Sequence, residues 1–298
     1  MLTNEQLIKR RSGIGGSDAG IICGLSKWAT PLDIYYQKIE EGEPEEQEIS
    51  EAAHFGNVLE DVVRKEYTRR TGVKVEQYDN MFRSENHSFM IANVDGWLPS
   101  ENKVLEIKTA RFPIGWGEPG TDEIPEVYMV QCQHYMEVMN SKLCDVAVLI
   151  GGSDFRIYHL EKNDELLGQI IAFEQTFWEM VTNRTIPEPA NSEECLQLWP
   201  TAKEGQTVAS EIGVNNYYAL KNIKEKIKGL EENKKKLEFS IKKELGENNE
   251  FFHMGGDRLA TWNTTISNRF DTKAFKKACP EEYEKYCKES KTRTFLLK

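Results

Sequence analysis

The spacing of apolar residues divides the first two thirds of the chain into helices and strands. Apolar side chains three or four residues apart predict a helix, and short alternating or continuous apolar runs predict strands. We therefore expect helices over residues 19–23, 32–39, 54–72, 125–140 and 164–181. We expect strands over residues 73–82, 88–98, 103–110, 144–152 and 155–162. This mixture predicts an α/β (α+β) fold.

The helix expected over residues 54–72 carries an acid on its apolar side. Its inner face is predicted to hold Val58, Leu59, Val62, Val63 and Tyr67. Glu60 falls on the same stripe as Val63 and Tyr67, where an unpaired carboxylate costs free energy unless it meets a cation or a metal. A structural salt bridge and a metal site both explain Glu60 at this point.

A proline-containing stretch predicts the domain boundary. Residues 186–194 contain Pro187 and Pro189, which interrupt the preceding pattern. We expect one domain over residues 1–190 and a C-terminal extension over residues 191–298, with a long helix and a small basic α/β tail. Within the extension, apolar residues alternate at three- and four-residue spacing, as in a coiled-coil or two-helix seam, with Lys234 at the skipped position. The seam residues are Leu220, Ile223, Ile227, Leu230, Leu237 and Ile241.

Composition limits the function classes only weakly. The chain has 298 residues, of which 39% are hydrophobic and 29% charged, as in ordinary globular proteins. The six cysteines are scattered without a CxxC pair, which predicts reduced thiols in the cytoplasm rather than zinc binding or disulfides. The net charge of −11 argues against a general nucleic-acid coat. It leaves a nuclease possible, because carboxylates that bind metals add negative charge and DNA needs only local positive charge.

The stretch VDGWLPSENKVLEIKTA places three charges in an apolar segment. We expect a hairpin that turns over residues 99–102, in a register that sets Asp95 opposite Glu106. Glu106 and Lys108 are two residues apart and therefore face the same side of their strand. Leu105 and Ile107 face the other side and can anchor the strand in a core.

These three side chains suit phosphodiester chemistry. Mg²⁺ prefers oxygen ligands, keeps several waters and commonly uses one or two carboxylates. It can stabilise the charge that develops on a phosphodiester and activate water. Lys108 could orient or deprotonate that water, or offset charge in the transition state. The competing interpretation is a surface hairpin in which a Glu and a Lys form an ion pair.

Four motifs occur in order along the chain and together resemble a known nuclease group. They are RRSGIGGSDAG (residues 10–20), FGNVLED (residues 55–61), NVDGW with EIKT (residues 93–109) and YMVQCQHYM (residues 128–136). The pattern is similar to the PD-(D/E)xK nuclease superfamily and, more narrowly, to the YqaJ-type viral recombinases, which are relatives of phage lambda exonuclease. Val94–Asp95 stands where the superfamily has Pro-Asp, and the proline is not a ligand.

The resemblance implies roles for the acidic and basic residues. Asp95, Glu106 and the carbonyl of Ile107 would be metal ligands, Lys108 the catalytic lysine, and Glu60 a further acid near the metals. The implied cofactor is Mg²⁺, for which Mn²⁺ would substitute.

The resemblance also implies a pocket for the 5′ phosphate of DNA, made by Arg10 and Ser17. Gly15 and Gly16 let the backbone approach a phosphate, and helix N–H groups near Ser17 favour anions. Arg11 is the alternative arginine, although the seven-residue spacing to Ser17 favours Arg10. Without the resemblance, GIGGSD is best interpreted as a flexible turn with a helix cap.

The glutamine that faces the site stays undecided between two positions. Gln131 and Gln133 lie on nearly opposite faces of one helix, so only one can reach the acids. The spacing to Tyr135 resembles a QxxxY motif and favours Gln131, whereas the match to the lambda-type enzyme favours Gln133, which we rank first. Trp116 could stack on a base or wedge between strands, but packing on its own domain is the favoured interpretation.

The resemblance as a whole implies a restriction-endonuclease-like core, with a mixed central sheet flanked by helices. It implies a Mg²⁺-dependent 5′-to-3′ exonuclease that digests one strand of linear duplex DNA and leaves a 3′ overhang for phage-type recombination. Its partners would be double-stranded DNA ends and a single-strand annealing protein of the RecT or Red-beta kind. We expect a homotrimer in the cytoplasm of a bacterial host, phage or prophage encoded, without membrane association.

Three alternatives differ in chemistry. An endonuclease or a Cas4-like nuclease would share the site, although a Cas4-like iron–sulfur centre needs clustered cysteines. A non-catalytic DNA-binding assembly protein would keep the fold, but should have lost one of Asp95, Glu106 and Lys108. A small-molecule hydrolase has no nucleophile–base motif to support it.

Overall fold

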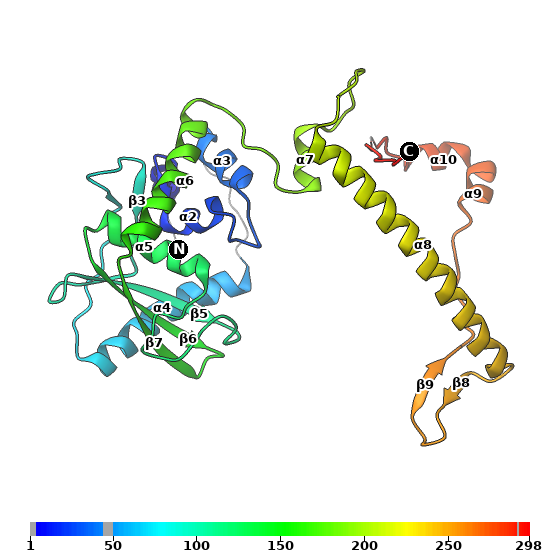
Figure 1. Cartoon of the computed structure of the whole chain (residues 1–298), viewed down its shortest axis with the longest axis horizontal. Helices are drawn as coiled ribbons and strands as arrows, with labels where there is room; N and C mark the ends of the chain where they lie inside the picture. The colour runs from blue at the N-terminus through cyan, green and yellow to red at the C-terminus, as the bar shows by residue number, and fades with distance from the viewer. Residues whose placement is uncertain (1–3, 44–49, 291) are drawn as a thin grey trace. The chain divides into compact units, whose positions relative to one another are not determined.

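The computed structural model describes residues 4–43, 50–290 and 292–298. It contains two compact units, Met1–Glu194 and Cys195–Lys298 (Figure 1). The division falls at the end of the proline-containing stretch 186–194. Each unit is described by itself below.

The N-terminal unit alternates helices and strands, as the apolar pattern predicts. Its first elements are α1 (Asn4–Arg10), β1 (Ile14–Gly15), α2 (Gly16–Ile22), α3 (Pro31–Ile39) and α4 (Glu51–Thr71). Then follow β2 (Phe82–Arg83), β3 (Met90–Ala92), β4 (Gly96–Leu98) and β5 (Lys103–Ala110). The unit continues with α5 (Glu126–Val138), β6 (Leu143–Ile150), β7 (Asp154–Glu161) and α6 (Asp164–Thr182), and it ends within α7 (Ser192–Leu198).

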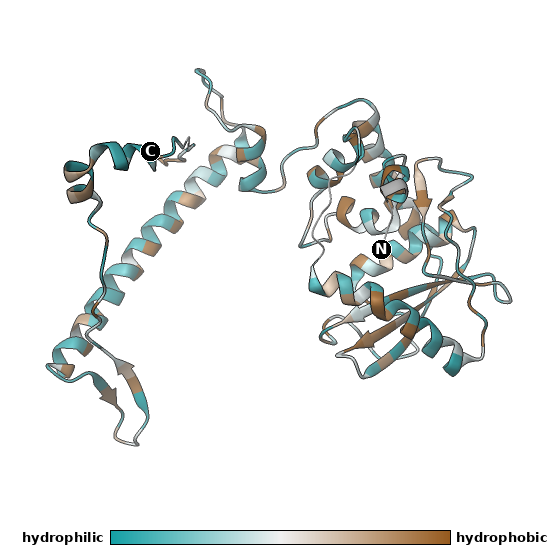
Figure 2. Ribbon diagram, turned by 180° about the vertical axis from the view of Figure 1, so that it is seen from behind, coloured by the Kyte–Doolittle hydropathy of each residue, from teal (hydrophilic) through white to brown (hydrophobic). Residues whose placement is uncertain are grey.

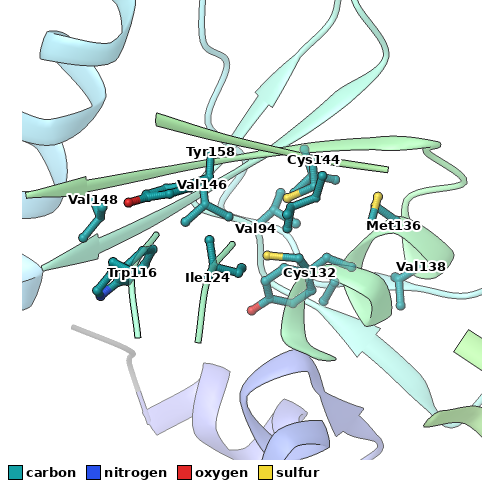
Figure 3. Packing of buried hydrophobic residues seen from close by; sticks show 14 of the residues in the cluster. Val94, Trp116, Ile124, Cys132, Met136, Val138, Cys144, Val146, Val148 and Tyr158 are labelled. Carbon is teal, nitrogen blue, oxygen red and sulfur yellow. The ribbon is translucent and has the colours of Figure 1, made fainter. Parts of the chain in front are cut away.

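A four-stranded mixed sheet forms the centre of this unit, in the order β4-β5-β6-β7. The β5 and β6 strands are parallel, whereas β4 pairs antiparallel with β5 and β7 antiparallel with β6. One face packs on α4 through Leu105, Ile107 and Val63. The other face packs on α5, where Cys132 and Met136 lie among residues of β6 and β7 (Figure 3). The expected mixed sheet flanked by helices is confirmed.

A smaller sheet positions the glycine-rich segment. The β1 strand pairs in parallel with β3, so Ile14 lies beside Met90 and Gly15 beside Ile91. The strand expected over residues 73–82 is largely wrong, because only an isolated bridge at Glu76 and the start of β2 form there. Gln77, Asp79 and Asn80 lie between them, and this segment lacks the alternation of apolar and polar residues that a half-buried strand shows.

The helix α4 buries one stripe of side chains and exposes the next. Val63 and Tyr67 are 1% exposed, as expected, but Val58 and Val62 are both 53% exposed. The prediction that these two valines lie inside is wrong. Neighbouring helical residues point about 100° apart, so Val58 and Val62 form a separate stripe beside the buried one.

Trp116 belongs to the core rather than to an exposed loop surface. Its side chain is 8% exposed, and its ring centroid lies 5.6 Å from that of Tyr128 and 5.3 Å from that of Tyr158. This position removes Trp116 as a candidate for base stacking or strand separation and supports the favoured packing interpretation.

The C-terminal unit is built around one long helix, α8 (Glu211–Leu245). A two-stranded hairpin of β8 (Glu250–Phe252) and β9 (Arg258–Thr261) follows, and then the short helices α9 (Thr272–Ala278) and α10 (Pro280–Lys285). One long helix, a short hairpin and two short helices thus follow one another in this unit. Figure 2 shows α8 as mainly hydrophilic, with hydrophobic residues at intervals along it. Within the described residues, no helix is long and apolar enough to cross a membrane.

Candidate active site

The β4–β5 hairpin brings Asp95 and Glu106 together. The pair Gly96 and Leu105 fixes a register that, continued by one residue, sets Asp95 opposite Glu106. The Oδ2 atom of Asp95 accepts a hydrogen bond of 2.8 Å from the backbone N–H of Ile107. Glu106 is 1% exposed, because β5 is covered on both faces. The register predicted for the hairpin is confirmed.

Two side chains donate to the same oxygen of the buried glutamate. Lys108 forms an ion pair with Oε1 of Glu106 from the same strand, and Gln131 of α5 donates to Oε1 at 2.7 Å. Burial disfavours the charged form of Lys108, but Glu106 and Asp95 outweigh it and hold the pKa of Lys108 above its ordinary value. Lys108 therefore stays a cation beside the two acids.

The second oxygen of Glu106 has no hydrogen-bond partner. Oε2 is buried, and within the described residues no donor reaches it. Burial, with Glu106 as the next cause, raises the pKa of Asp95 from 3.8 to about 7. A buried carboxylate with an unpartnered oxygen, beside the half-buried Asp95, fits a hard divalent cation, which would supply the missing positive charge. The residues therefore fit the Mg²⁺ that the family resemblance implies.

Glu60 lies near Asp95, but it does not form a three-carboxylate cluster with Asp95 and Glu106. Burial and the nearby Asp95 raise the pKa of Glu60, while its carboxylate forms an ion pair with Arg64 one turn along α4. The side chain of Glu60 is 36% exposed. Across the part of the chain that is described, no group of three or more His, Cys, Asp and Glu side chains is arranged to hold a metal. The ion pair with Arg64 is consistent with a structural salt bridge, and the nearby Asp95 is consistent with a metal site. The metal role of Glu60 stays a prediction.

The structure also joins Arg10 to Ser17 across the glycine-rich turn. Nη2 of Arg10 donates to Oγ of Ser17 at 2.8 Å. Arg11 points elsewhere, because it forms an ion pair with Glu40 and donates to the carbonyl of Gly42 at 2.6 Å. The structure therefore places Arg10, and not Arg11, beside Ser17, as the seven-residue spacing favours, and the phosphate-binding role stays a prediction.

Asp18 and Lys38 hold Arg10 in place and were not predicted. Asp18 accepts from Lys38 at 2.7 Å, from Arg10 at 3.3 Å and from the N–H of Gly15 at 3.0 Å. Burial raises the pKa of Asp18, but Lys38 and Arg10 outweigh that and leave it below its ordinary value. Lys38 also donates to the carbonyl of Arg10 at 2.8 Å. A signal existed for Lys38, since it lies four residues after Ile34 on the buried stripe of α3.

Tyr135 lies between the arginine pocket and the acids. A Cβ atom on Gly16 would come within 2.4 Å of the Tyr135 ring, so this ring packs directly on the glycine-rich turn. Gln131 lies 3.2 Å from the Tyr135 hydroxyl and also reaches Glu106. A chain of contacts thus runs from Gly16 in the glycine-rich turn through Tyr135 and Gln131 to Glu106.

Gln133 lies on the other side of α5 and does not reach the acids. It donates to the carbonyl of Glu161 at 2.9 Å and accepts from the N–H of Asn163 at 2.9 Å. The ranking of Gln133 ahead of Gln131 is therefore wrong. The rotation of α5 is further fixed by His134, which contacts Glu174 at 2.7 Å and the carbonyl of Ile91 at 2.9 Å.

Comparison with known proteins identifies the family. The profile of the YqaJ-like viral recombinase domain matches residues 7–142. The chain is 38% identical to the uncharacterized protein YqaJ of Bacillus subtilis (strain 168) over 309 residues, which cover 100% of this chain and 95% of that protein. The chain belongs to the family of YqaJ-like viral recombinases.

Two solved structures resemble the chain more distantly. The alkaline exonuclease LHK-Exo from Laribacter hongkongensis is 19% identical, with a TM-score of 0.49 over 61% of this chain and 94% of that one. A phage related exonuclease from Haemophilus somnus 129PT is 14% identical, with a TM-score of 0.44 over 58% of this chain and 96% of that one. Likenesses this low carry no conclusion about activity.

The raised pKa of Asp95 predicts a pH-dependent cost to stability in the metal-free protein. A carboxyl whose folded pKa is about 7, against 3.8 unfolded, binds more protons when folded. The free energy of unfolding should therefore fall as the pH rises from about 4 to about 7. Asp95→Asn should remove this dependence and stabilise the protein at about pH 8, by on the order of 1 kcal/mol because the group is partly solvated.

Urea unfolding in EDTA at about pH 5 and about pH 8 checks this expectation. The exposed Asp79→Asn serves as the control and should behave like the wild type. Added Mg²⁺ should stabilise the wild type more than Asp95→Asn. Equal pH dependence in the wild type and Asp95→Asn would contradict a raised pKa of Asp95 beside Glu106.

Proposed function

We propose that the protein is a Mg²⁺-dependent 5′-to-3′ exonuclease that digests one strand of linear duplex DNA and leaves a 3′ overhang. The observation that carries this proposal is the buried Glu106. One of its oxygens is held by Lys108 and Gln131, the other has no partner, and Asp95 lies directly opposite. Membership in a viral recombinase family supports a role in DNA recombination.

The residues divide the chemistry between them. Asp95, Glu106 and the carbonyl of Ile107 would hold Mg²⁺, which when bound stabilises charge on a phosphodiester and activates water. Lys108 stays charged next to Glu106, so it is suited to orient the attacking water and to offset charge on phosphate oxygens. Gln131 holds Glu106 in one orientation, which fixes the direction of its free oxygen.

Hydrolysis at the acid pair produces the group that Arg10 and Ser17 would bind. Water attacks phosphorus, the bond from phosphorus to the 3′ oxygen breaks, and the first nucleotide leaves with a 3′ hydroxyl. The next nucleotide then carries a new 5′ phosphate. Arg10 and Ser17 supply a guanidinium and a hydroxyl that suit that phosphate, with Asp18 and Lys38 fixing the arginine. Each turnover thus regenerates the end that the pocket recognises.

The proposed biological partner follows from the product. A 3′ single strand left by the enzyme is the substrate of a single-strand annealing protein, as in recombination systems of the viral recombinase type. We place the protein in the cytoplasm of a bacterial cell, where such a phage or prophage system acts.

Cleavage of end-labelled DNA tests the proposal. Linear duplex labelled separately at each end is incubated with Mg²⁺ or EDTA, beside a closed circular control. Release of mononucleotides from the 5′ end in Mg²⁺ alone, with the circle intact, is the expected result. Nicking of the circle would favour an endonuclease. Binding without cleavage in any divalent metal would favour a non-catalytic assembly protein.

Lys108→Ala should abolish cleavage while DNA binding remains. Removal of one group that stabilises developing charge typically slows a reaction by about 100-fold or more. The matched control is Lys65→Ala, since the Lys65 side chain is 77% exposed on α4 and forms its ion pair with Asp61 rather than with Asp95 or Glu106. Cleavage by Lys108→Ala at the rate of the control would exclude a catalytic role for this lysine.

Arg10→Ala should selectively slow the digestion of ends that carry a 5′ phosphate. Loss of a charged hydrogen-bond donor predicts a decrease of about tenfold in the preference for phosphorylated over dephosphorylated ends. Arg11→Ala removes the neighbouring arginine, which is held by Glu40 and Gly42, and should keep the preference. An unchanged preference in Arg10→Ala would remove the phosphate pocket from the proposal.

Gln131→Ala and Gln133→Ala should differ in kind. Gln131→Ala frees Glu106 and should lower the turnover of folded protein by about 10-fold or more, as for other residues that orient a metal ligand. Gln133→Ala loses two bonds to backbone groups and should lower the free energy of unfolding by about 1–3 kcal/mol with turnover retained. Turnover under single-turnover conditions and urea unfolding of both variants measure the two effects. A larger loss of turnover in Gln133→Ala would reverse the assignment.

A further inference from the structure

The end of the chain is basic, although the protein as a whole is acidic. Residues 258–298, the basic segment, contain ten lysines and arginines against five aspartates and glutamates. The net charge of this segment is therefore +5, and that of the rest of the chain is −16, which gives −11 for the whole protein. A charge that changes sign along one chain indicates a local surface for a polyanion.

The positive charges of the basic segment are not neutralised by the protein. Nine of its ten lysines and arginines are described, all but Lys291, and all nine side chains are exposed. Among the described residues, Arg258 is the one of these nine that forms an ion pair with an acidic side chain, that of Glu250 at 3.0 Å. The other eight charges are therefore available to a partner that carries negative charge.

Aromatic rings alternate with these charges. Lys276 lies 5.0 Å from the ring centroid of Tyr283, and Lys285 lies 5.7 Å from that of Tyr286. The rings do not form a core, because Leu245 is the one buried residue among the described residues of the C-terminal unit. Four of the six aromatic side chains in the basic segment are between 50% and 80% exposed, namely Trp262, Phe270, Tyr286 and Phe295.

Contacts with α8 hold the basic segment near both of its ends. Close to its start, the ring of Trp262 lies 5.7 Å from the ammonium group of Lys242. At its end, the hydroxyl of Tyr217 donates to the carbonyl of Lys298 at 2.8 Å. The chain thus returns from the β8–β9 hairpin toward the start of α8 (Figure 1). Between these contacts, residues 262–271 form neither helix nor strand and expose Trp262 and Phe270.

We propose that the basic segment binds single-stranded DNA without sequence preference. Lysines and arginines bind the phosphates of a single strand, and exposed rings stack on its bases, because every base has a flat face. Duplex DNA satisfies the charges but not the rings, since its bases already stack on one another. The segment therefore fits an unpaired strand better than a duplex.

The source of this strand rests on the proposed function, because the digestion of one strand leaves the other as a 3′ overhang. The binding itself does not rest on it. The basic segment belongs to the unit Cys195–Lys298, whereas the acid pair and the arginine pocket belong to the unit Met1–Glu194. Absence of cleavage would leave the binding proposal intact, and absence of binding by the segment would leave the nuclease proposal intact.

Binding of labelled oligonucleotides to the full chain in EDTA tests the proposal. Fluorescence anisotropy compares oligo(dT) of about 16 nucleotides, the upper site size of a single-strand binding fold, with a blunt duplex of the same length. The wild type should bind oligo(dT) more tightly. Tighter binding of the duplex, or of oligo(rU), would overturn the assignment to single-stranded DNA.

Removal of two rings tests the stacking. Trp262→Ala with Phe270→Ala should weaken the binding of oligo(dT) by about 10-fold or more. The matched control is Trp28→Ala with Tyr218→Ala, which removes two side chains that are 95% and 63% exposed outside the segment and should keep the affinity. Equal affinities of the ring variant and the control variant would exclude stacking on the segment.

Removal of three charges tests the phosphate contacts by a measurement that does not depend on the rings. Lys273→Gln with Lys276→Gln and Lys277→Gln changes exposed residues of α9. The slope of log affinity against log salt concentration should become shallower by about 2, because each phosphate contact in a single strand contributes about 0.7. The matched control changes the exposed Lys65, Lys74 and Lys142 of the other unit to Gln. A slope that stays at the control value in the α9 variant would overturn the proposal.

Discussion

The burial of Glu106 next to Asp95 is the constraint on which the site depends. A carboxylate on a strand covered on both faces is destabilising unless cations and hydrogen bonds offset its charge. The protein supplies Lys108 and Gln131 to one oxygen and leaves the other without a donor. The negative charge of the two acids is thus only partly offset by the protein's own groups, and a divalent cation would complete the arrangement. Stability lost in the metal-free state is linked directly to metal binding.

The helix α5 connects Glu106 to the proposed phosphate pocket of Arg10 and Ser17. His134 and Gln133 fix its rotation by contacts with α6, β3 and the end of β7, so Gln131 has to face Glu106. One turn further along, Tyr135 packs on Gly16 of the glycine-rich turn. The distance from Gly16, next to the proposed phosphate-binding residues, to the acid pair is therefore set by one helix. An exonuclease that removes one nucleotide at a time needs such a fixed spacing between the end of the strand and the bond that breaks.

The hairpin could be predicted from the sequence because its information is local. The alternation of Leu105, Glu106, Ile107 and Lys108 sets the two faces of β5, and the turn over residues 99–102 sets the register. The choice between Gln131 and Gln133 could not be made in this way, because every residue from Val130 to Val138 is buried and periodicity shows no outer face.

Contacts between distant segments were also beyond the sequence. Lys38 and Asp18 are 20 residues apart and lie on different helices, so the local sequence pattern does not predict their ion pair. The burial predicted for Val58 and Val62 is wrong for a local reason, since apolar residues on a helix need not face the core of the protein. The seam of α8 was visible as a heptad pattern, but its exposure depends on the absence of a covering element in its unit, which only the folded arrangement shows.

The central claim is that the pair Asp95 and Glu106 is a divalent metal site, and a crystal structure with Mn²⁺ tests it most directly. Anomalous scattering locates Mn²⁺ without reference to the protein chain. We expect a peak in contact with Asp95, with the unpartnered oxygen of Glu106 and with the carbonyl of Ile107, and we expect the peak to be lost in Asp95→Asn. A site that stays empty at saturating Mn²⁺, with Lys108 still paired to Glu106, would contradict the account.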